Sequence, residues 1–296
     1  MVWLKRIGLF IFVNVLIMTT VSVVWSLISS YFGMTGYVPY LIVFSGVMGF
    51  GGAFLSLMIS KWVAKSMYGV QVIDPHTSDP QLRTLVERVH SMARAAHLPK
   101  MPEVGIYESP DLNAFATGPS KSNSLVAVST GLLQRMNERE VDGVLAHEVS
   151  HIANGDMVTM TLIQGIVNTF ALFFSRILAQ VAASNVEERY RPMVMFACTI
   201  LGDILFTLLG SIVVSYFSRA REFRADAGGA RLSSRENMVG ALRKLQAVYE
   251  SPLAHYDQED GLATLKISHR QRGGLASLFL THPPLEVRIQ ALERGR

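Results

Sequence analysis

The chain has 296 residues, of which 50% are hydrophobic and 17% are charged, and its mean hydropathy is +0.30. Soluble domains carry about 25% charged residues, so this composition, with its apolar residues gathered in four blocks, excludes an ordinary soluble protein and indicates a membrane protein. The net charge of +4 does not favour a nucleic-acid partner, and the single cysteine excludes a disulfide framework, so any bound metal must use histidine and carboxylate ligands.

Residues 1–60 are predicted to form two transmembrane helices. Their apolar blocks, 7–28 and 38–60, are each long enough to span roughly 30 Å of hydrocarbon at about 1.5 Å per residue. A cleaved secretory signal also begins with basic residues, but its apolar region is shorter and a small-residue cleavage site follows it, which favours a signal anchor here. Basic residues flank the outer ends of both blocks and the loop between them is uncharged, so both outer ends are expected in the cytoplasm.

Residues 61–156 are predicted to be the first part of a cytoplasmic domain. Asp79 and Pro80 have the residue types of an N-cap and a first helical position, and apolar residues follow them at helical spacing. Three short β-rich stretches, EVGIYES, NAFATG and SLVAVST, are separated by turn residues and predict a small sheet. The sequence NERE, from Asn137 to Glu140, predicts a capping box at the start of the next helix.

The segment 157–217 contains two apolar blocks and is predicted to form a transmembrane hairpin. The alternative is a pair of long helices that pack against the rest of the protein, since the two blocks have a length and composition that suit both arrangements. In a hairpin, Arg176 is expected to snorkel to the far interface and Asp203 to face a neighbouring helix. The number of membrane crossings is even in both cases, so residues 218–296 are expected to form the second part of the same cytoplasmic domain.

Two histidines and a glutamate in the sequence AHEVSHIANGD are the strongest sign of catalytic chemistry in the chain. His147 and His151 are four residues apart, so a helix presents both imidazoles on one face, where one ion can bind them at about 2.0–2.1 Å. In this H-E-x-x-H arrangement, Glu148 can reach a water held on the ion, take its proton and pass it to the leaving amine. The motif also arises by coincidence on amphipathic helices, but the distinct histidine face and the polar stop after it favour a metal site.

A third protein ligand is expected, because hydrolytic zinc sites generally have three. The segment SRAREFRADAGGA places Glu222 and Asp226 four residues apart, on one face of a helix. One carboxylate can bind the metal while the other accepts the remaining N–H of a ligand histidine. A solvated, ion-paired face that includes Arg219 is the alternative, and the spacing alone does not decide between the two.

The motifs AHEVSHIANGD and SRAREFRADAGG together resemble those of the HtpX-type membrane zinc metalloproteases. These are bacterial heat-shock proteases related to the CAAX prenyl proteases, and the resemblance extends over nearly the whole chain. It implies an α-helical membrane protein with about four transmembrane helices and an α+β, zincin-like (gluzincin) metallopeptidase domain. It also implies one Zn²⁺ per chain, with Glu222 as the third ligand beside His147 and His151, and with Asp226 as the partner of a ligand histidine.

The same resemblance gives a role to the sequence THPPLEVR near the end of the chain. His282 and Arg288 match a histidine and an arginine that line the cleft of the prenyl proteases and stabilise the oxyanion, where a donor or a cation meets developing negative charge. The alternative is that His282 and Pro283 start the last helix, and that Arg288 pairs with Glu286 or with lipid.

The sequence NAFATG resembles the edge strand that holds the substrate backbone in zinc proteases. An extended peptide can add itself to such an edge through main-chain hydrogen bonds. Asn113 would then orient the substrate, and Ala114 and Ala116 would leave room for it. Alternatively, Asn113 is a turn residue that opens a strand.

Family membership would imply a zinc metalloendopeptidase that spans the bacterial inner (plasma) membrane several times and has its catalytic domain in the cytoplasm. Its partners would be the lipid bilayer and misfolded or damaged membrane proteins, which it would degrade in quality control and stress response, and it would be capable of self-cleavage. Two other functions remain open. One is a narrow-specificity processing peptidase of the prenyl-protease kind, for which four apolar blocks are few to enclose a lipid chamber. The other is a non-catalytic, zinc-stabilised chaperone or scaffold, which would not need a base at Glu148.

Overall fold

The computed structural model of the chain describes residues 37–249, 278 and 280–295. It divides into two compact units, described separately below. The helical unit comprises Met1–Met58 and Thr159–Val214, and the sheet unit comprises Ile59–Val158 and Ser215–Arg296. The first predicted transmembrane block, 7–28, lies outside the described residues.

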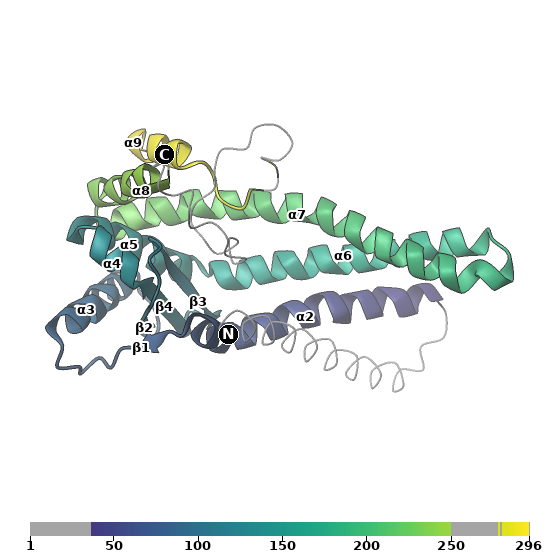
Figure 1. Ribbon diagram of the computed structural model, residues 1–296, viewed down its shortest axis with the longest axis horizontal. Helices are drawn as coiled ribbons and strands as arrows, with labels where there is room; N and C mark the ends of the chain where they lie inside the picture. Colours follow the sequence, from purple (N-terminus) through teal and green to yellow (C-terminus); the bar gives the residue numbers. More distant parts are fainter. Residues whose placement is uncertain (1–36, 250–277, 279, 296) are drawn as a thin grey trace. The chain divides into compact units, whose positions relative to one another are not determined.

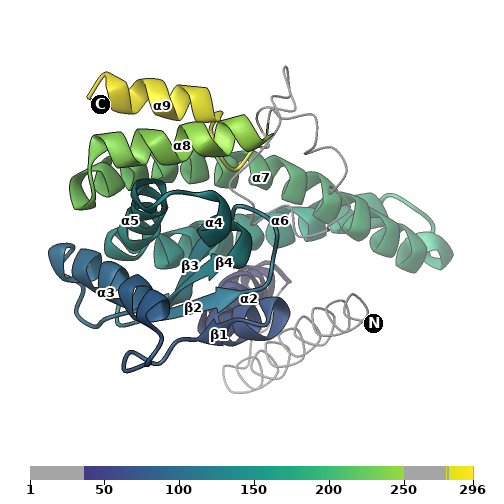
Figure 2. The ribbon, with the colours of Figure 1, turned by 60° about the vertical axis from the view of Figure 1, so that its left-hand side comes forward.

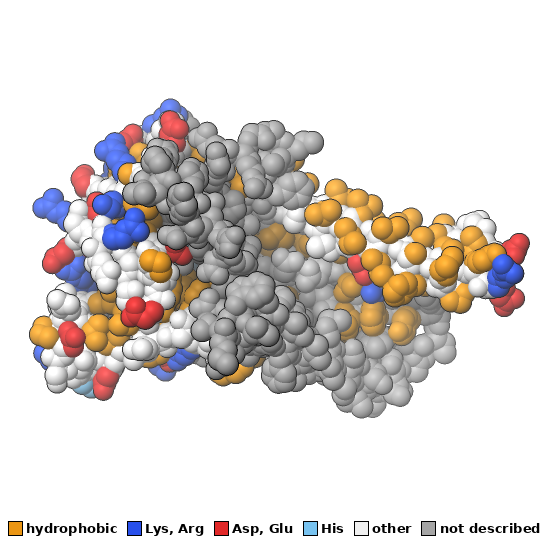
Figure 3. Space-filling view, in the orientation of Figure 1, with side chains coloured by type: hydrophobic (Ala, Val, Ile, Leu, Met, Phe, Trp, Pro, Cys, Tyr) orange, Lys and Arg blue, Asp and Glu red, His pale blue; other side chains and the backbone are white. Residues whose placement is uncertain are grey.

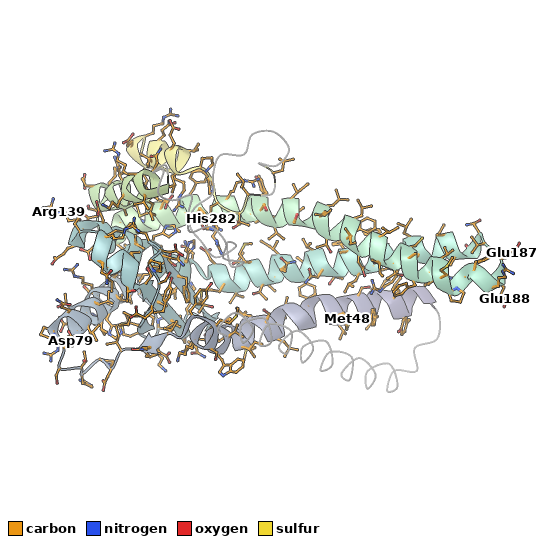
Figure 4. The ribbon with its side chains drawn as sticks, viewed as in Figure 1. Met48, Asp79, Arg139, Glu187, Glu188 and His282 are labelled. Carbon is orange, nitrogen blue, oxygen red and sulfur yellow. The ribbon has the colours of Figure 1, made fainter. Side chains whose placement is uncertain are left out.

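The helical unit is built from parts of three long helices, α2 (Tyr37–Tyr68), α6 (Asp156–Ser184) and α7 (Arg191–Leu232), which are labelled in Figure 1. A short 3-10 helix, η1 (Glu188–Tyr190), lies between α6 and α7. Among the described residues, three helical stretches are long and apolar enough to cross a membrane, and they run through Tyr40–Tyr68, Asp156–Ser184 and Glu188–Leu232. In Figure 3, orange apolar side chains are prominent on the visible end of the α6–α7 hairpin, while charged side chains gather at its tip, where Figure 4 labels Glu187 and Glu188.

Glycines allow the helices of this unit to pack closely. A Cβ added to Gly202 of α7 would lie 2.8 Å from the Cβ of Ser175 on α6, and one added to Gly165 of α6 would lie 2.6 Å from the ring of Phe50 on α2. Because lipid is as apolar as a leucine side chain, membrane helices associate through such close contacts rather than through hydrophobic burial.

The two charged side chains inside the hairpin form an ion pair. Nη1 of Arg176 donates to Oδ1 of Asp203 at 2.9 Å, and the hydroxyl of Ser175 donates to the same oxygen. The guanidinium also lies 5.8 Å from the ring centroid of Phe44 on α2. The prediction that Asp203 faces a neighbouring helix is confirmed, and the pairing with Arg176 makes each charge less costly in hydrocarbon, because the other neutralises it.

The sheet unit contains a four-stranded mixed sheet with the order β1-β2-β4-β3. The strands are β1 (Gln71–Val72), β2 (Glu103–Tyr107), β3 (Ala114–Ser120) and β4 (Asn123–Ser129). β2 and β4 run parallel, while β3 is antiparallel to β4 and lies at the edge of the sheet. The three β-rich stretches of the sequence are thus the three longer strands.

The helices that lie wholly within the sheet unit are α3 (Pro80–Ala95), α4 (Thr130–Arg135), α5 (Glu138–Asn154), α8 (Arg235–Tyr249) and α9 (Leu285–Glu293). Side-chain caps fix the N-termini of α3, α4, α5 and α8, whereas α9 begins after Pro284 without one. Asp79 accepts hydrogen bonds from the first turn of α3, and Asn137 and Glu140 form the predicted capping box at the start of α5. Each such cap contributes about 1 kcal/mol by satisfying backbone N–H groups that the helix leaves unpaired.

Both faces of the sheet are covered within the unit. On one face, Val126 and Val128 of β4 belong to a core that includes residues of α3, α5 and α8. On the other face, Tyr107 and Phe115 pack against Tyr68 of α2, with ring centroids 5.1–5.6 Å apart. Figure 2 shows α8 and α9 stacked in turn beyond α5. This packing makes α5, which carries the H-E-x-x-H motif, the central helix of the unit.

Candidate metal centre

The two histidines of α5 face a common point. His147 and His151 lie one helical turn apart, and their Nε2 atoms are 3.1 Å from each other. α5 ends immediately after them at Gly155, whose φ of 71° is a left-handed conformation that glycine adopts without strain. Only 5% of the His147 side chain and 11% of the His151 side chain is exposed. The helix therefore presents a preformed, nearly dry pair of nitrogen donors.

Glu222 of α7 completes a triangle of donor atoms. Its Oε1 lies 3.4 Å from Nε2 of His151, and its Oε2 lies 3.5 Å from Nε2 of His147. Two donors bound at about 2.0–2.1 Å by a tetrahedral ion are roughly 3.3 Å apart, so the three N–N and N–O distances, which involve both oxygens of Glu222, are close to the spacing that one small divalent cation requires. His147, His151 and Glu222 therefore form a group that could hold a metal ion.

Two glycines explain how α7 comes close enough to α5 to deliver this carboxylate. A Cβ added to Gly228 would lie 2.6 Å from Oγ of Ser150 and 2.9 Å from its Cβ. One added to Gly229 would lie 3.1 Å from the backbone nitrogen of His147. The pair Gly228-Gly229 thus lets the two helices cross nearly in backbone contact, beside the turn of α5 that carries the histidines.

Gly228→Ala is expected to lower the melting temperature of the purified chain, because overpacking against the buried Ser150 costs about 1–3 kcal/mol. Gly240→Ala on α8 is the matched control, since a Cβ there would meet only Cγ of Glu140, at 3.9 Å. The control should be as stable as the wild type or slightly more so, because alanine favours a helix over glycine. Equal melting temperatures for the two variants would contradict the close crossing.

Asp226 and Arg288 form a buried ion pair next to the triangle. Oδ1 of Asp226 lies 3.0 Å from Nδ1 of His147. Arg288, on α9, donates to both oxygens of Asp226, through Nε at 2.8 Å and Nη2 at 2.6 Å. Its Nη1 lies 3.3 Å from Oε2 of Glu222, and only 1% of its side chain is exposed. One guanidinium therefore compensates two buried carboxylates, and it is these carboxylates that contact His147.

The charges in this cluster shift the pKa values of its members. Burial raises the pKa of Asp226, but the charge and hydrogen bonds of Arg288 and His147 outweigh it and lower the pKa to about 2. Burial also raises the pKa of Glu222, but His147, His151, His282 and Arg288 hold it well below its usual value. Burial lowers the pKa of His147, yet Asp226 and Glu222 raise it to about 9. Both carboxylates are therefore ionised near neutral pH, and a metal that binds His147 must displace a proton.

His282 approaches the same carboxylate from the C-terminal segment. Its Nδ1 lies 3.0 Å from Oε2 of Glu222, and 14% of its side chain is exposed. Figure 4 shows its side chain beside α7, the helix that carries Glu222. Nη1 of Arg219 donates to the carbonyl oxygens of Leu278 and Leu280, which fixes the chain just before His282. The structure thus brings the histidine of THPPLEVR to the donor triangle, and it pairs Arg288 with Asp226 and Glu222 rather than with Glu286 or lipid.

Glu148 follows His147 on α5 and is also buried, with 4% of the residue exposed. It forms no hydrogen bond or ion pair with another residue in the part of the chain that the structure describes. The other carboxylates of the centre, Glu222 and Asp226, are held by cations or imidazoles. Within the described ranges, Glu148 is thus a buried carboxylate without a hydrogen-bond or ion-pair partner, and it directly follows His147 in the sequence.

Asp156 is a member of the cluster that the motif spacing did not predict. Its Oδ2 lies 2.6 Å from Nδ1 of His151, and only 2% of its side chain is exposed. It is the first residue of α6 and follows Gly155 directly, so the sharp turn after α5 returns its carboxylate to the last helical turn. A carboxylate five residues after the second histidine is the signal that could have identified it.

The three residues predicted to bind substrate lie on or beside β3, the edge strand. Asn113 is 5% exposed, and its Oδ1 is buried without a hydrogen-bond partner among the described residues. Ala114 and Ala116 belong to the core face of the sheet, on the side of α5. Their small side chains therefore make room for α5, and β3 is an edge strand in the order of the sheet. Within the described ranges, no hydrogen bond or ion pair links Asn113, Ala114 or Ala116 to His147, His151 or Glu222.

The sequence of this chain is similar to known proteins over most of its length. Residues 79–295 match the sequence profile described as Peptidase family M48. The chain belongs to this family. It is 52% identical over 299 residues to "Protease HtpX homolog" of Bacillus subtilis (strain 168), with 98% of this chain and 99% of the relative covered. It is 49% identical over 300 residues to "Protease HtpX" of Thioalkalivibrio sulfidiphilus, with the same coverage.

Among solved structures, the fold resembles that in "Crystal Structure of S. mikatae Ste24p". The TM-score is 0.63 at 19% sequence identity, and the match covers 98% of this chain but 66% of the other. This likeness concerns the fold alone.

Membership of family M48 confirms the resemblance to the HtpX-type proteases, and with it a protease and a membrane protein. The predicted fold class is confirmed as well, since a small sheet and several apolar helices long enough to span occur together. The family is one of metallopeptidases, so it implies a metal, and the donor triangle is where the described residues could hold one.

Proposed function

We propose that this M48 protease is a zinc-dependent endopeptidase that hydrolyses membrane proteins on the cytoplasmic side of the bacterial inner membrane. The observation that carries the proposal is the donor triangle of His147, His151 and Glu222, whose donor atoms lie 3.1–3.5 Å apart, together with the carboxylate of Glu148, which follows His147 and has no hydrogen-bond partner among the described residues. A structural metal site needs the three metal ligands but does not need the carboxylate of Glu148. The combination therefore favours a peptidase over a zinc-stabilised scaffold.

The composition of the triangle favours zinc. Two neutral imidazoles and one carboxylate are a ligand set of zinc hydrolases, whereas magnesium and calcium prefer oxygen ligands alone. When bound there, zinc supplies Lewis acidity toward a carbonyl oxygen and lowers the pKa of water. Asp226 accepts the Nδ1 proton of His147 in this proposal, which keeps the lone pair of Nε2 turned to the metal.

Glu148 acts as the general base and then as the general acid. Its carboxylate takes a proton from the attacking water and passes it to the nitrogen of the leaving amine. The absence of other hydrogen bonds among the described residues leaves both of its oxygens free for this transfer. General acid–base catalysis of this kind contributes about 10²- to 10⁴-fold to the rate.

His282 and Arg288 take different parts. Nδ1 of His282 faces Glu222, so Nε2 is the nitrogen that can donate to the oxygen of a carbonyl under attack. Arg288 is 1% exposed and its fork is occupied by Asp226, so we assign it to positioning the two carboxylates. This assignment replaces the oxyanion role expected for Arg288 from the family resemblance.

The backbone edge of β3 is the proposed binding surface for the substrate. A peptide that adds to this edge is held by main-chain hydrogen bonds, which read an extended conformation more than a sequence. Oδ1 of Asn113, buried without a partner among the described residues, can accept one further hydrogen bond from such a peptide. Broad specificity for extended, unfolded segments follows from this mode of binding.

The candidate membrane helices support substrates that are themselves membrane proteins, and misfolded or damaged proteins are the class that the resemblance to the HtpX-type proteases implies. The basic flanks of the first two apolar blocks support a cytoplasmic active site. A protease that recognises the backbone of an extended segment, and not its side chains, can also bind extended loops of its own chain. Self-cleavage is therefore part of the proposal.

The test uses sealed membrane vesicles that contain the full chain and a quenched, membrane-impermeant peptide. Cleavage is expected in inside-out vesicles, where the cytoplasmic face is accessible, and not in right-side-out ones. A zinc chelator should abolish cleavage, and added Zn²⁺ should restore it. Cleavage confined to right-side-out vesicles would refute the orientation, and cleavage that resists chelation would refute the metal mechanism.

A further inference from the structure

Each imidazole of the donor triangle has a carboxylate on its second nitrogen. Nδ1 of His147 faces Asp226 at 3.0 Å, and Nδ1 of His151 faces Asp156 at 2.6 Å. Both Nε2 atoms point to the common site. A carboxylate that accepts the proton of Nδ1 fixes the tautomer and leaves the lone pair of Nε2 free for a cation. The two aspartates come from different helices, and the contact of Asp156 with His151 is the shorter one and is a hydrogen bond.

The position of Asp156 is determined by the junction between α5 and α6. Gly155, with φ of 71°, is the single residue that separates the two helices. Its N–H bonds back to the carbonyl oxygens of His151 and Ile152, so the turn is closed onto the last turn of α5. A side chain that directly follows this turn has little freedom, and that of Asp156 is 2% exposed.

The other carboxylate oxygen of Asp156, Oδ1, lies on the side of α7. Oδ1 lies 3.9 Å from Nη2 of Arg224, a side chain that is 61% exposed. Arg224 lies two residues from Glu222 on the same helix. The carboxylate of Asp156 thus has a ligand histidine on one side and an exposed cation on the other, and no other described residue shares it.

We propose that Asp156 is a positioning residue for the metal centre, which holds the His151 ring and its tautomer from the first residue of α6. The proposal rests on the zinc site proposed above and adds a residue outside the H-E-x-x-H and E-F-x-A-D motifs. It also makes zinc affinity depend on the α5–α6 junction, since any change of that turn moves the acceptor of His151.

The experiment measures zinc affinity on the purified full chain in detergent, by competition with a chromophoric chelator. Asp156→Asn keeps the shape and one acceptor oxygen but removes the charge, whereas Asp156→Ala removes the acceptor. Zinc dissociation constants are expected to rise about 10- to 100-fold for Asp156→Asn and further for Asp156→Ala. Asp142→Asn on α5, which pairs with Arg88 at 3.4 Å, is the matched control and should bind zinc like the wild type.

Two more readouts separate positioning from a merely structural role. The melting temperature of the metal-free Asp156→Asn protein should stay near that of the wild type, while the absorption bands of the Co²⁺-substituted protein should shift. Zinc affinity equal to that of Asp142→Asn, or a loss that metal-free unfolding fully explains, would overturn the proposal. If the wild type itself bound no zinc, the proposed function would fail first, so the two failures are distinguishable.

Discussion

Replacing Glu148 with glutamine is expected to reduce peptide hydrolysis by about 10²- to 10⁴-fold in kcat, while the protein still binds one equivalent of zinc. The amide has nearly the size of the carboxylate, so it should fit the same buried position. It cannot accept a proton from water, and the transfer to the leaving amine is lost with it. The donor triangle does not include Glu148, so metal binding should be unaffected.

The measurement combines metal analysis of the purified protein with the rate of cleavage of an unfolded protein substrate in detergent. Glu138→Gln is the control, because it makes the same substitution on the same helix at an 83% exposed side chain that pairs with Arg88. The control should cleave at the wild-type rate. Normal cleavage by Glu148→Gln would rule out this residue as the base, and loss of zinc would show that it holds the metal instead.

Much of the sheet unit is predictable because its signals are local. The capping box of α5 and the Asp79 cap of α3 depend on residues within four positions of one another, and both form as expected. The alternation along β4, where Val126 and Val128 face one core while Leu125 and Ala127 face the other, is a property of any strand. His147 and His151 meet for the same reason, since helical geometry alone makes them neighbours.

Sequence spacing can assign a helix cap to the wrong residue when two neighbouring residues are both able to form it. Ser233 and Glu236 have the spacing of a capping box at the start of α8, but Ser234 caps that helix by accepting from the backbone N–H of Asn237. The hydroxyl of Ser233 instead donates to the carbonyl oxygen of Gly229, because Ser233 directly follows α7 and its backbone N–H bonds to that same oxygen. Adjacent serines offer the same chemistry, and only the path of the chain decides between them.

Local residue patterns do not predict contacts between segments that are far apart in the sequence. Glu222 lies 75 positions from His147 and Arg288 lies 62 from Asp226, and no periodicity links residues so far apart. The family resemblance named Glu222, Asp226, His282 and Arg288, and the structure gathers them around His147. Asp156 lies outside the named motifs, and its contact with His151 depends on the left-handed turn at Gly155, which returns a carboxylate five residues after this histidine to its ring.

Arg288→Met is expected to destabilise the metal-free protein by about 3–5 kcal/mol and to weaken zinc binding as well. The substitution leaves Asp226 and Glu222 buried beside each other without the guanidinium that compensates them. Arg288→Lys retains the charge but cannot donate to both oxygens of Asp226, so its effect should be smaller. Melting temperature and zinc affinity of the two variants, measured in detergent, give the comparison.

A double variant then separates positioning from catalysis. Replacing both members of a buried ion pair with apolar residues is often neutral, so Asp226→Leu combined with Arg288→Met should recover much of the lost stability. Zinc affinity should not recover, because Nδ1 of His147 loses its acceptor. If Arg288 instead stabilised the oxyanion, Arg288→Met would keep the wild-type melting temperature and zinc affinity and lose only kcat, an outcome that would return this residue to the catalytic group.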